Sequence, residues 1–146
     1  MEPNFKIRSA VLHDLDTVFS FISHLEERTF DFNRFKEKYS DNLSREEVIY
    51  LVAVNEVDEV IGFISCHGQE LLHHEGQVFE IQEMYVARNY RDRGIGKALY
   101  AALLDKLTKS DCESLEVSTQ TKRTDAKRFY LKLGFVQSHV KFVKEM

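Results

Sequence analysis

The feature that most constrains the fold is a basic, glycine-containing turn at residues 90–99, which reads Tyr-Arg-Asp-Arg-Gly-Ile-Gly-Lys-Ala-Leu. A strand-like apolar run precedes it, and a run with helical periodicity follows it. Gly94 and Gly96 allow a tight turn, and a helix that begins there adds unpaired N–H donors and the positive end of its dipole. Three side chains add full positive charge: Arg91, Arg93 and Lys97. A strand, a basic turn and a helix N-terminus together predict a site for a phosphorylated ligand.

Spacing excludes two familiar phosphate-binding loops. Aligning Gly96 with the end of the P-loop pattern G-x-x-x-x-G-K-[ST] places Arg91 at the first glycine and Ala98 at the magnesium-binding hydroxyl. The dinucleotide pattern G-x-G-x-x-G fails because Leu99 stands at its third glycine. The pattern that remains is R-x-x-G-x-G, beginning at Arg91. A plain surface turn before an ordinary helix is the alternative interpretation.

The remaining pattern resembles the acetyl-coenzyme A signature of the GNAT N-acetyltransferase superfamily. A second segment, at 124–135, is similar to the family's A-x-x-F-Y-x-x-x-G-F segment, with matches at Ala126, Phe129, Tyr130, Gly134 and Phe135. Arg123 departs from the pattern, because many members carry there an asparagine that contacts the pantetheine arm. From about Leu72 onward the chain also resembles the aminoalkylphosphonate N-acetyltransferases, for example in Leu-His-His at 72–74 and Glu-Ile-Gln-Glu at 80–83.

The resemblance implies that acetyl-coenzyme A (acetyl-CoA) is the cosubstrate. Arg91, Lys97 and the backbone amides of the turn are expected to hold the pyrophosphate, while the backbone of the preceding strand pairs with the pantetheine arm like an added strand. The expected cofactor-binding residues are Met84, Tyr85, Val86, Arg91, Asp92, Arg93, Gly94, Ile95, Gly96 and Lys97.

Acetyl transfer to an amine requires a base for the ammonium proton and an acid for the leaving thiolate. Glu80 is the favoured base, directly or through a water, and Glu83 is the second candidate. Strict alternation places the two on opposite faces of their strand, so both reach one site only if a bulge intervenes. A solvated surface role is the alternative for either carboxylate. Tyr130 is the expected general acid, because the matching tyrosine in resembling enzymes lies beside the coenzyme A sulfur; core packing is its alternative.

Basic and histidine residues are candidates for the acceptor side of the site. His73 and His74, with carboxylates nearby, suggest either a divalent metal site or a polar wall of the acceptor pocket. Lys122 and Arg123 could bind an anionic acceptor without a metal. The residues themselves do not decide between these two ways of holding an anion.

Composition narrows the class of protein. The 146 residues, 43% of them hydrophobic, predict one compact domain spanning 1–146. A net charge of −4 argues against nucleic acid as a main partner, and the two cysteines are too few for a disulfide framework. No targeting or membrane-spanning segment is evident, so we expect a cytoplasmic protein without membrane attachment. Members of the resembling family often pair through edge strands, which makes a homodimer the assembly to test.

Hydrophobic periodicity predicts a mixed α/β chain (α+β type) with the order β-α-α-β-β-β-α-β-α-β. The expected strands are 5–9, 48–55, 60–67, 78–87, 113–119 and 135–144, and the expected helices are 14–27, 31–39, 94–109 and 124–133. This order matches the single-domain GNAT fold that the resemblance implies, a mainly antiparallel sheet of about six strands with four helices, whose central strands splay to admit the cofactor.

The function that follows is acetyl-CoA-dependent N-acetylation of the primary amine of a small molecule, with an aminoalkylphosphonate as first choice. Direct attack in a ternary complex is expected, because no cysteine lies beside a histidine in a nucleophile arrangement. The alternatives are another amine (a polyamine, an aminoglycoside or a protein N-terminus) and a non-catalytic coenzyme A-binding regulatory module.

Overall fold

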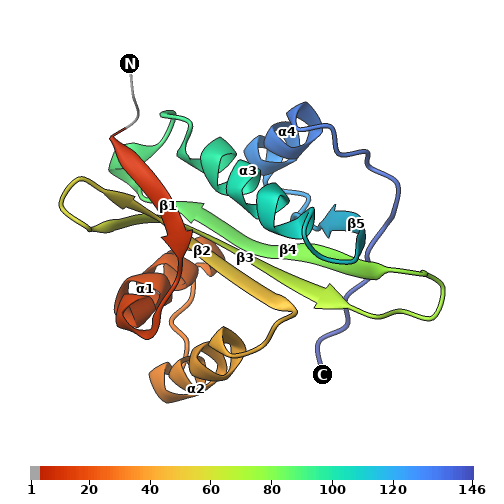
Figure 1. The fold of residues 1–146 in the computed structure, drawn as a ribbon, viewed down its shortest axis with the longest axis horizontal. Helices are drawn as coiled ribbons and strands as arrows, with labels where there is room; N and C mark the ends of the chain where they lie inside the picture. The colour runs from red at the N-terminus through yellow and green to blue at the C-terminus, as the bar shows by residue number, and fades with distance from the viewer. Residues whose placement is uncertain (1–3) are drawn as a thin grey trace.

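The computed structural model describes residues 4–146, in which a five-stranded sheet is packed between α-helices (Figure 1). The strands are β1 (Phe5–Ser9), β2 (Val48–Asn55), β3 (Val60–Gln69), β4 (Gln77–Val86) and β5 (Cys112–Val117). The helices are α1 (Leu15–Glu26), α2 (Phe32–Leu43), α3 (Ile95–Leu107) and α4 (Thr124–Lys132), with 3-10 turns at Leu12–Asp14 and Arg88–Tyr90. The predicted order of elements is confirmed from β1 through α4. Each of the helices described is too short or too polar to cross a membrane.

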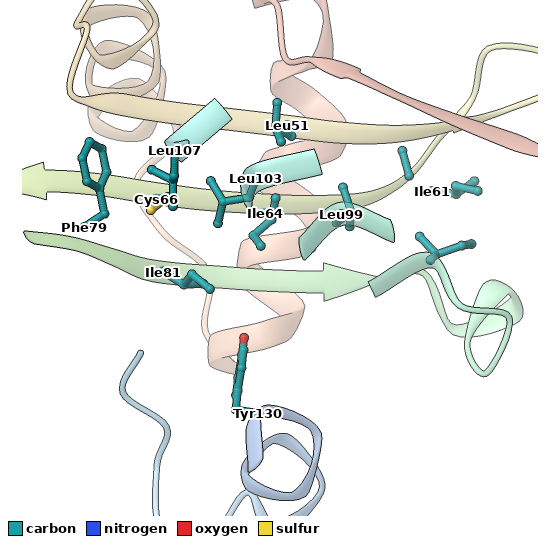
Figure 2. Close-up of a cluster of buried hydrophobic side chains, with 12 residues drawn as sticks. Leu51, Ile61, Ile64, Cys66, Phe79, Ile81, Leu99, Leu103, Leu107 and Tyr130 are labelled. Atoms are coloured by element: carbon teal, nitrogen blue, oxygen red, sulfur yellow. The ribbon is translucent and has the colours of Figure 1, made fainter. Parts of the chain in front are cut away.

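The sheet has the order β1-β2-β3-β4-β5, and its ladders are antiparallel except for the parallel pair β4–β5. Helix α3 covers one face, where Leu99, Leu103 and Leu107 repeat at helical spacing and pack against the buried side chains of the strands (Figure 2). Helices α1 and α2 cover the other face, against a second core that includes Val18, Val52 and Phe63 (Figure 1). The two cores fix β3 and β4 in the middle of the molecule.

Strand β4 separates from its neighbour β5 partway along its length. The parallel ladder with β5 ends at the pair Ile81 and Val117. The antiparallel ladder with β3 continues five residues further, to the pair Val86 and Gly62. The edge of residues 82–86 that faces away from β3 therefore carries backbone groups with no strand partner. The expected splay of the central strands is present.

A bulge interrupts the pairing of β3 and β4. Ser65 lies opposite Glu83 and Cys66 lies opposite Ile81, so Gln82 is the extra residue. A strict two-residue alternation would place Ile81 and Glu83 on the same face. With the bulge, Ile81 points into the core under α3, whereas Glu83 contacts Ser65 on the face that carries α1 and α2. The condition for bringing both candidate bases to one face is thus met.

The predicted sixth strand at 135–144 is wrong. Helix α4 ends at Lys132, and Gly134, two residues beyond it, has a φ of 96°. The N–H groups of Gly134 and Phe135 donate to the carbonyls of Leu131 and Tyr130 at 3.1 Å. Beyond this cap, residues 135–146 form no helix or strand and expose several apolar side chains: Val136, Val140, Phe142 and Val143. The alternation of apolar and polar residues produces a strand only where a neighbouring strand supplies hydrogen bonds, and β5 is paired with β4 alone within the described chain.

Candidate active site

An open cleft of about 1530 Å³ lies where β4 and β5 separate. Its lining includes residues 81–86 of β4, the glycine turn, the end of α1, and the segment from the end of β5 into α4. Seven lysines or arginines line it, against four acidic residues: Arg91, Lys97, Lys122, Arg123, Arg128, Lys132 and Lys141, against Glu26, Glu83, Asp92 and Asp125. The chain as a whole has a net charge of −4, so positive charge is concentrated in this cleft. Such a cleft favours an anionic ligand.

The glycine turn presents an uncapped helix N-terminus to the cleft. Gly94 is the N-cap of α3, with φ at 81°, and it offers no side chain to the N–H groups of the first turn. The N–H of Ala98 makes the first intrahelical bond, to the carbonyl of Gly94 at 3.0 Å. The amides of residues 95–97 precede that bond and have no intrahelical acceptor. Asp92 also has a positive φ, 62°, so the turn holds two left-handed residues. This is the geometry in which backbone donors bind phosphate.

The arginines of the turn lie in different places. The Arg91 Nε donates to the carbonyl of Val86 at 2.9 Å, and its guanidinium lies 5.2 Å from the centre of the Tyr85 ring. Arg93 instead lies over the ring of Tyr90, at 5.4 Å, and is not part of the cleft lining in residues 4–146. The other nine expected cofactor-binding residues all line the cleft. The carbonyl of Val86 already accepts a hydrogen bond, which leaves the remaining backbone groups of the free β4 edge to pair with a ligand.

Of the two candidate bases, Glu83 is the one that lines the cleft in the described residues. Burial raises the pKa of the Glu83 carboxyl above its usual range, and the hydrogen bond from Ser65 together with the nearby His67 offsets part of that rise. A carboxylate with a raised pKa is a stronger base than an exposed one and is better matched to work near neutral pH. The structure therefore gives Glu83 the environment expected of a catalytic base.

Glu80, the base favoured from sequence, lies on the same face but nearer to the start of β4. It lies opposite His67 across the β3–β4 ladder. Its carboxylate accepts hydrogen bonds from Gln82 Nε2 at 3.0 Å and from Ser118 Oγ at 3.2 Å. It is not among the cleft-lining side chains of the described residues. Both partners are uncharged donors on exposed residues, so Glu80 lacks a buried hydroxyl partner such as the one Glu83 has in Ser65.

Tyr130 lies in the last turn of α4 and lines the cleft. Figure 2 shows its hydroxyl directed from α4 toward β4. The ring packs edge-on against Phe129 and Phe135, at 5.2 and 5.5 Å between centroids, and only 8% of the residue is exposed. Burial raises the pKa of Tyr130 to about 12, which keeps the phenol protonated at neutral pH. The residue therefore combines packing with a proton available to the cleft.

Lys122 and Arg123 connect the segment after β5 to the end of α1. The Arg123 Nη2 donates to the carbonyl of Leu25 at 2.6 Å and lies 3.4 Å from the Glu26 carboxylate. The Lys122 Nζ lies 3.7 Å from Glu27, in an exposed ion pair. We call the contact of Arg123 with Leu25 and Glu26 the Arg123 clasp. Through these contacts Arg123 connects two walls of the cleft, the end of α1 and the segment after β5.

The two histidines lie elsewhere, in the loop between β3 and β4, at the end of β4 opposite the glycine turn (Figure 1). His74 Nδ1 is hydrogen-bonded to the Glu113 carboxylate, which also accepts the N–H groups of Glu75 and Gly76 at 3.0 and 3.1 Å. Neither His73 nor His74 is in the cleft lining, and in the described part of the chain no three histidine, cysteine or acidic residues are grouped so as to hold a metal ion. In the described residues the structure therefore places His73 and His74 neither in a three-ligand metal group nor in the wall of the cleft.

Sequence reasoning missed a polar group behind Glu83. Ser65 and His67 face the α1–α2 side of β3, and the ring of His67 lies 6.1 Å from that of Tyr50. The Tyr50 hydroxyl accepts a hydrogen bond from Asn42 Nδ2 at 2.8 Å. The available signal was the strand 60–67, Val-Ile-Gly-Phe-Ile-Ser-Cys-His, in which Ser65 and His67, two positions apart, interrupt an otherwise apolar run.

Comparison with known proteins agrees with this geometry. The model of the Acetyltransferase (GNAT) family matches residues 11–135. The aminoalkylphosphonate N-acetyltransferase of Salmonella typhimurium is 37% identical over 144 residues, which cover 99% of this chain and 93% of that protein. Two solved structures share the fold at low identity. A transcriptional regulator from Bacillus halodurans has a TM-score of 0.88 at 20% identity, covering 97% of this chain and 99% of its own. An aminoglycoside N-acetyltransferase in complex with CoA has a TM-score of 0.84 at 19% identity, and the match covers 97% of this chain and 94% of that chain. The chain therefore belongs to the acetyltransferase (GNAT) family and is an N-acetyltransferase.

Proposed function

We propose that this enzyme transfers the acetyl group of acetyl-CoA to the primary amine of a small anionic molecule, with an aminoalkylphosphonate as the first choice. The observation that carries the proposal is the meeting, in one cleft, of a free β-strand edge with an uncapped, basic helix N-terminus. The first suits the amide-containing pantetheine arm and the second suits a pyrophosphate. The choice of acceptor is supported by the 37% identity to an aminoalkylphosphonate N-acetyltransferase.

The cofactor would lie with its pyrophosphate on the amides of residues 95–97. Lys97 and Arg91 line the cleft beside these amides and supply positive charge. The pantetheine arm would extend along residues 82–86 of β4 as an added strand. Hydrogen bonding to this edge would place the thioester between β4 and Tyr130, which lies across the cleft on α4.

The chemistry requires only groups of this chain and the two substrates. The amine nitrogen attacks the thioester carbonyl carbon, a C–N bond forms, and the C–S bond breaks. Glu83 accepts the proton that the ammonium loses, and its burial in the cleft ranks it ahead of Glu80 for this role. Tyr130 donates its phenolic proton toward the departing thiolate sulfur. Attack is direct, within a ternary complex.

The acceptor's anionic group would bind near the Arg123 clasp. Lys122 and Arg123 line the cleft close to the end of α1, and both now pair with carboxylates or carbonyls that a phosphonate can replace as hydrogen-bond acceptors. The excess of basic over acidic side chains in the lining disfavours a polycation such as a polyamine. An acceptor that carries both an amine and an anion fits the lining best.

A thiol-release assay with a panel of amines tests the proposal. The panel contains 1-aminoethylphosphonate, alanine (a carboxylate in place of the phosphonate), ethylamine (no anionic group) and spermidine (a polycation). Each amine is assayed with and without EDTA. We expect kcat/KM for the phosphonate to exceed that for ethylamine by about tenfold or more, the effect of one charge-assisted hydrogen bond. A preference for spermidine would refute the anionic acceptor. Acetyl-CoA binding with no thiol released from acetyl-CoA in the presence of any of these amines would refute catalysis in favour of a regulatory role.

A matched pair of variants ranks the two carboxylates. Glu83→Gln should lower kcat/KM by roughly 10²-fold, most strongly at low pH, with partial recovery as rising pH deprotonates the amine in solution. Glu80→Gln should have a smaller effect, because Glu80 lies outside the cleft lining of residues 4–146. If both variants keep the wild-type pH profile, neither carboxylate is the base.

A further inference from the structure

Ser65 makes two hydrogen bonds to a single partner, and that partner is Glu83. Its Oγ accepts the backbone N–H of Glu83 at 3.0 Å, and its hydroxyl donates to Glu83 Oε1. Ser65 itself is 0% exposed, in the middle of β3. One buried hydroxyl thus contacts both the main chain and the carboxylate of the same residue.

The β-bulge explains why a hydroxyl is needed here. Gln82 is the extra residue, so the ladder is broken where Ser65 faces Glu83. A buried N–H without a partner is costly, and beside the bulge the Ser65 Oγ accepts the N–H of Glu83. Accepting that N–H leaves the single hydroxyl proton free to point at the carboxylate. The bulge and the serine therefore define where the Glu83 side chain lies.

We propose that Ser65 is a positioning residue that holds the Glu83 carboxylate ionised and directed into the cleft. The proposal deepens the proposed function and rests on it, since it concerns the base assigned there. Donation of a hydrogen bond to a carboxylate favours its charged form, and here that donation opposes the effect of burial. Without it, Glu83 would hold its proton to higher pH and would lose its fixed orientation.

Three other groups face Glu83 from the elements around it. His67, on β3, favours the ionised carboxylate, and Glu26, at the end of α1, disfavours it. Burial raises the pKa of the phenol of Tyr50, on β2, and the nearby charge of Glu83 raises it further, so Tyr50 stays neutral. Within the described residues Ser65 alone makes a hydrogen bond to the Glu83 side chain. It is therefore the contact whose removal should move the Glu83 titration most directly.

The test removes the hydroxyl with Ser65→Ala and uses Ser65→Cys, which keeps a group of similar size with a weaker donor, as the second variant. Ser114→Ala is the matched control, because Ser114 has a buried Oγ with no hydrogen-bond partner in residues 4–146. The titration of Glu83 is followed by NMR of protein carrying ¹³C-labelled glutamate, with the resonance assigned by its loss in Glu83→Gln. The pH profile of kcat/KM and the acetyl-CoA affinity are measured on the same proteins.

We expect Ser65→Ala to raise the midpoint of the Glu83 titration and to shift the acid limb of the pH profile upward equally, with acetyl-CoA affinity within about twofold of wild type. The Glu83 midpoint in Ser65→Cys should lie between those of wild type and Ser65→Ala. If the alanine variant does not fold, the cysteine variant alone provides the test. A Glu83 midpoint that is unmoved in both variants, or that moves as much in Ser114→Ala, overturns the proposal. A midpoint that rises while the acid limb stays in place supports the hold of Ser65 on Glu83 and instead overturns the assignment of Glu83 as base.

Discussion

Replacing Gly94 with valine isolates the contribution of the turn's backbone geometry. The residue has φ 81°, a left-handed conformation that costs an L-residue about 1–2 kcal/mol, with β-branched side chains at the upper end. An added Cβ would meet no heavy atom within 4 Å, so the penalty at that atom is conformational rather than steric. The reduced freedom of the unfolded chain returns less than about 1 kcal/mol. With the cost for valine near 2 kcal/mol, the net penalty is roughly 1–1.5 kcal/mol, or about five- to twelvefold in an equilibrium constant.

This penalty must appear in one of two measurements. If the turn keeps its shape in the free protein, the free energy of unfolding falls by that amount. If the turn relaxes until ligand restores it, acetyl-CoA affinity falls by the same factor. Chemical denaturation measures the loss of unfolding free energy and titration calorimetry measures the loss of acetyl-CoA binding free energy, and the two losses together should equal the penalty.

Gly134 offers a matched control. Its φ is 96°, an added Cβ there also meets nothing within 4 Å, and it lies at the end of α4 outside the cleft lining of the described chain. Gly134→Val should lose comparable stability while keeping acetyl-CoA affinity. The reasoning is refuted if Gly94→Val leaves stability and affinity both unchanged, or if Gly134→Val weakens acetyl-CoA binding as strongly.

Three further predictions follow from the site. Tyr130→Phe should keep acetyl-CoA affinity and lower kcat by roughly 10²-fold. A variant that turns over at the wild-type rate would show that Tyr130 serves only in packing. Glu83→Gln should be more stable than wild type at neutral pH. Burial raises the pKa of the folded carboxyl above that of the unfolded chain, so the ionised form opposes folding at high pH, and the difference should vanish below about pH 4. A stability difference that grows on acidification in denaturant titrations would contradict this sign. Arg123→Ala should raise KM for 1-aminoethylphosphonate by about tenfold while leaving KM for ethylamine unchanged, whereas equal changes would assign Arg123 a purely structural role.

Local patterns predicted most of the fold because they report which face of each element is buried. The bounds of β1 and β2 match the expected ranges, and the helices differ mainly at their ends. Helix α2 continues to Leu43, beyond the predicted end at residue 39, because the three polar residues 40–42 interrupt the apolar pattern before Leu43. The strand expected at 135–144 failed for a non-local reason, since a strand also needs a partner with free hydrogen-bonding groups.

The candidate site was also predictable in its local parts and not in its non-local parts. The glycine turn could be predicted because the strand end, the turn and the helix start are contiguous in sequence. The relative positions of Glu80 and Glu83 could not be predicted, because the extra residue in β4 depends on how β4 pairs with β3. The sequence of β4 alone does not determine that pairing. The partners of Arg123 and His74 were equally hidden, since they lie 98 and 39 positions away in the chain.

The Arg123 clasp also has a consequence for how the molecule opens. It links two segments 98 positions apart through one side chain that is 28% exposed. Contacts of this kind open locally, at a free energy well below that of unfolding the central strands. Amide protons in the last turn of α1 and in residues 118–123 should therefore exchange with solvent together, and faster than those of β2 and β3. The mouth of the cleft would then form a cooperative unit of its own, one that opens and closes while the sheet behind it stays intact.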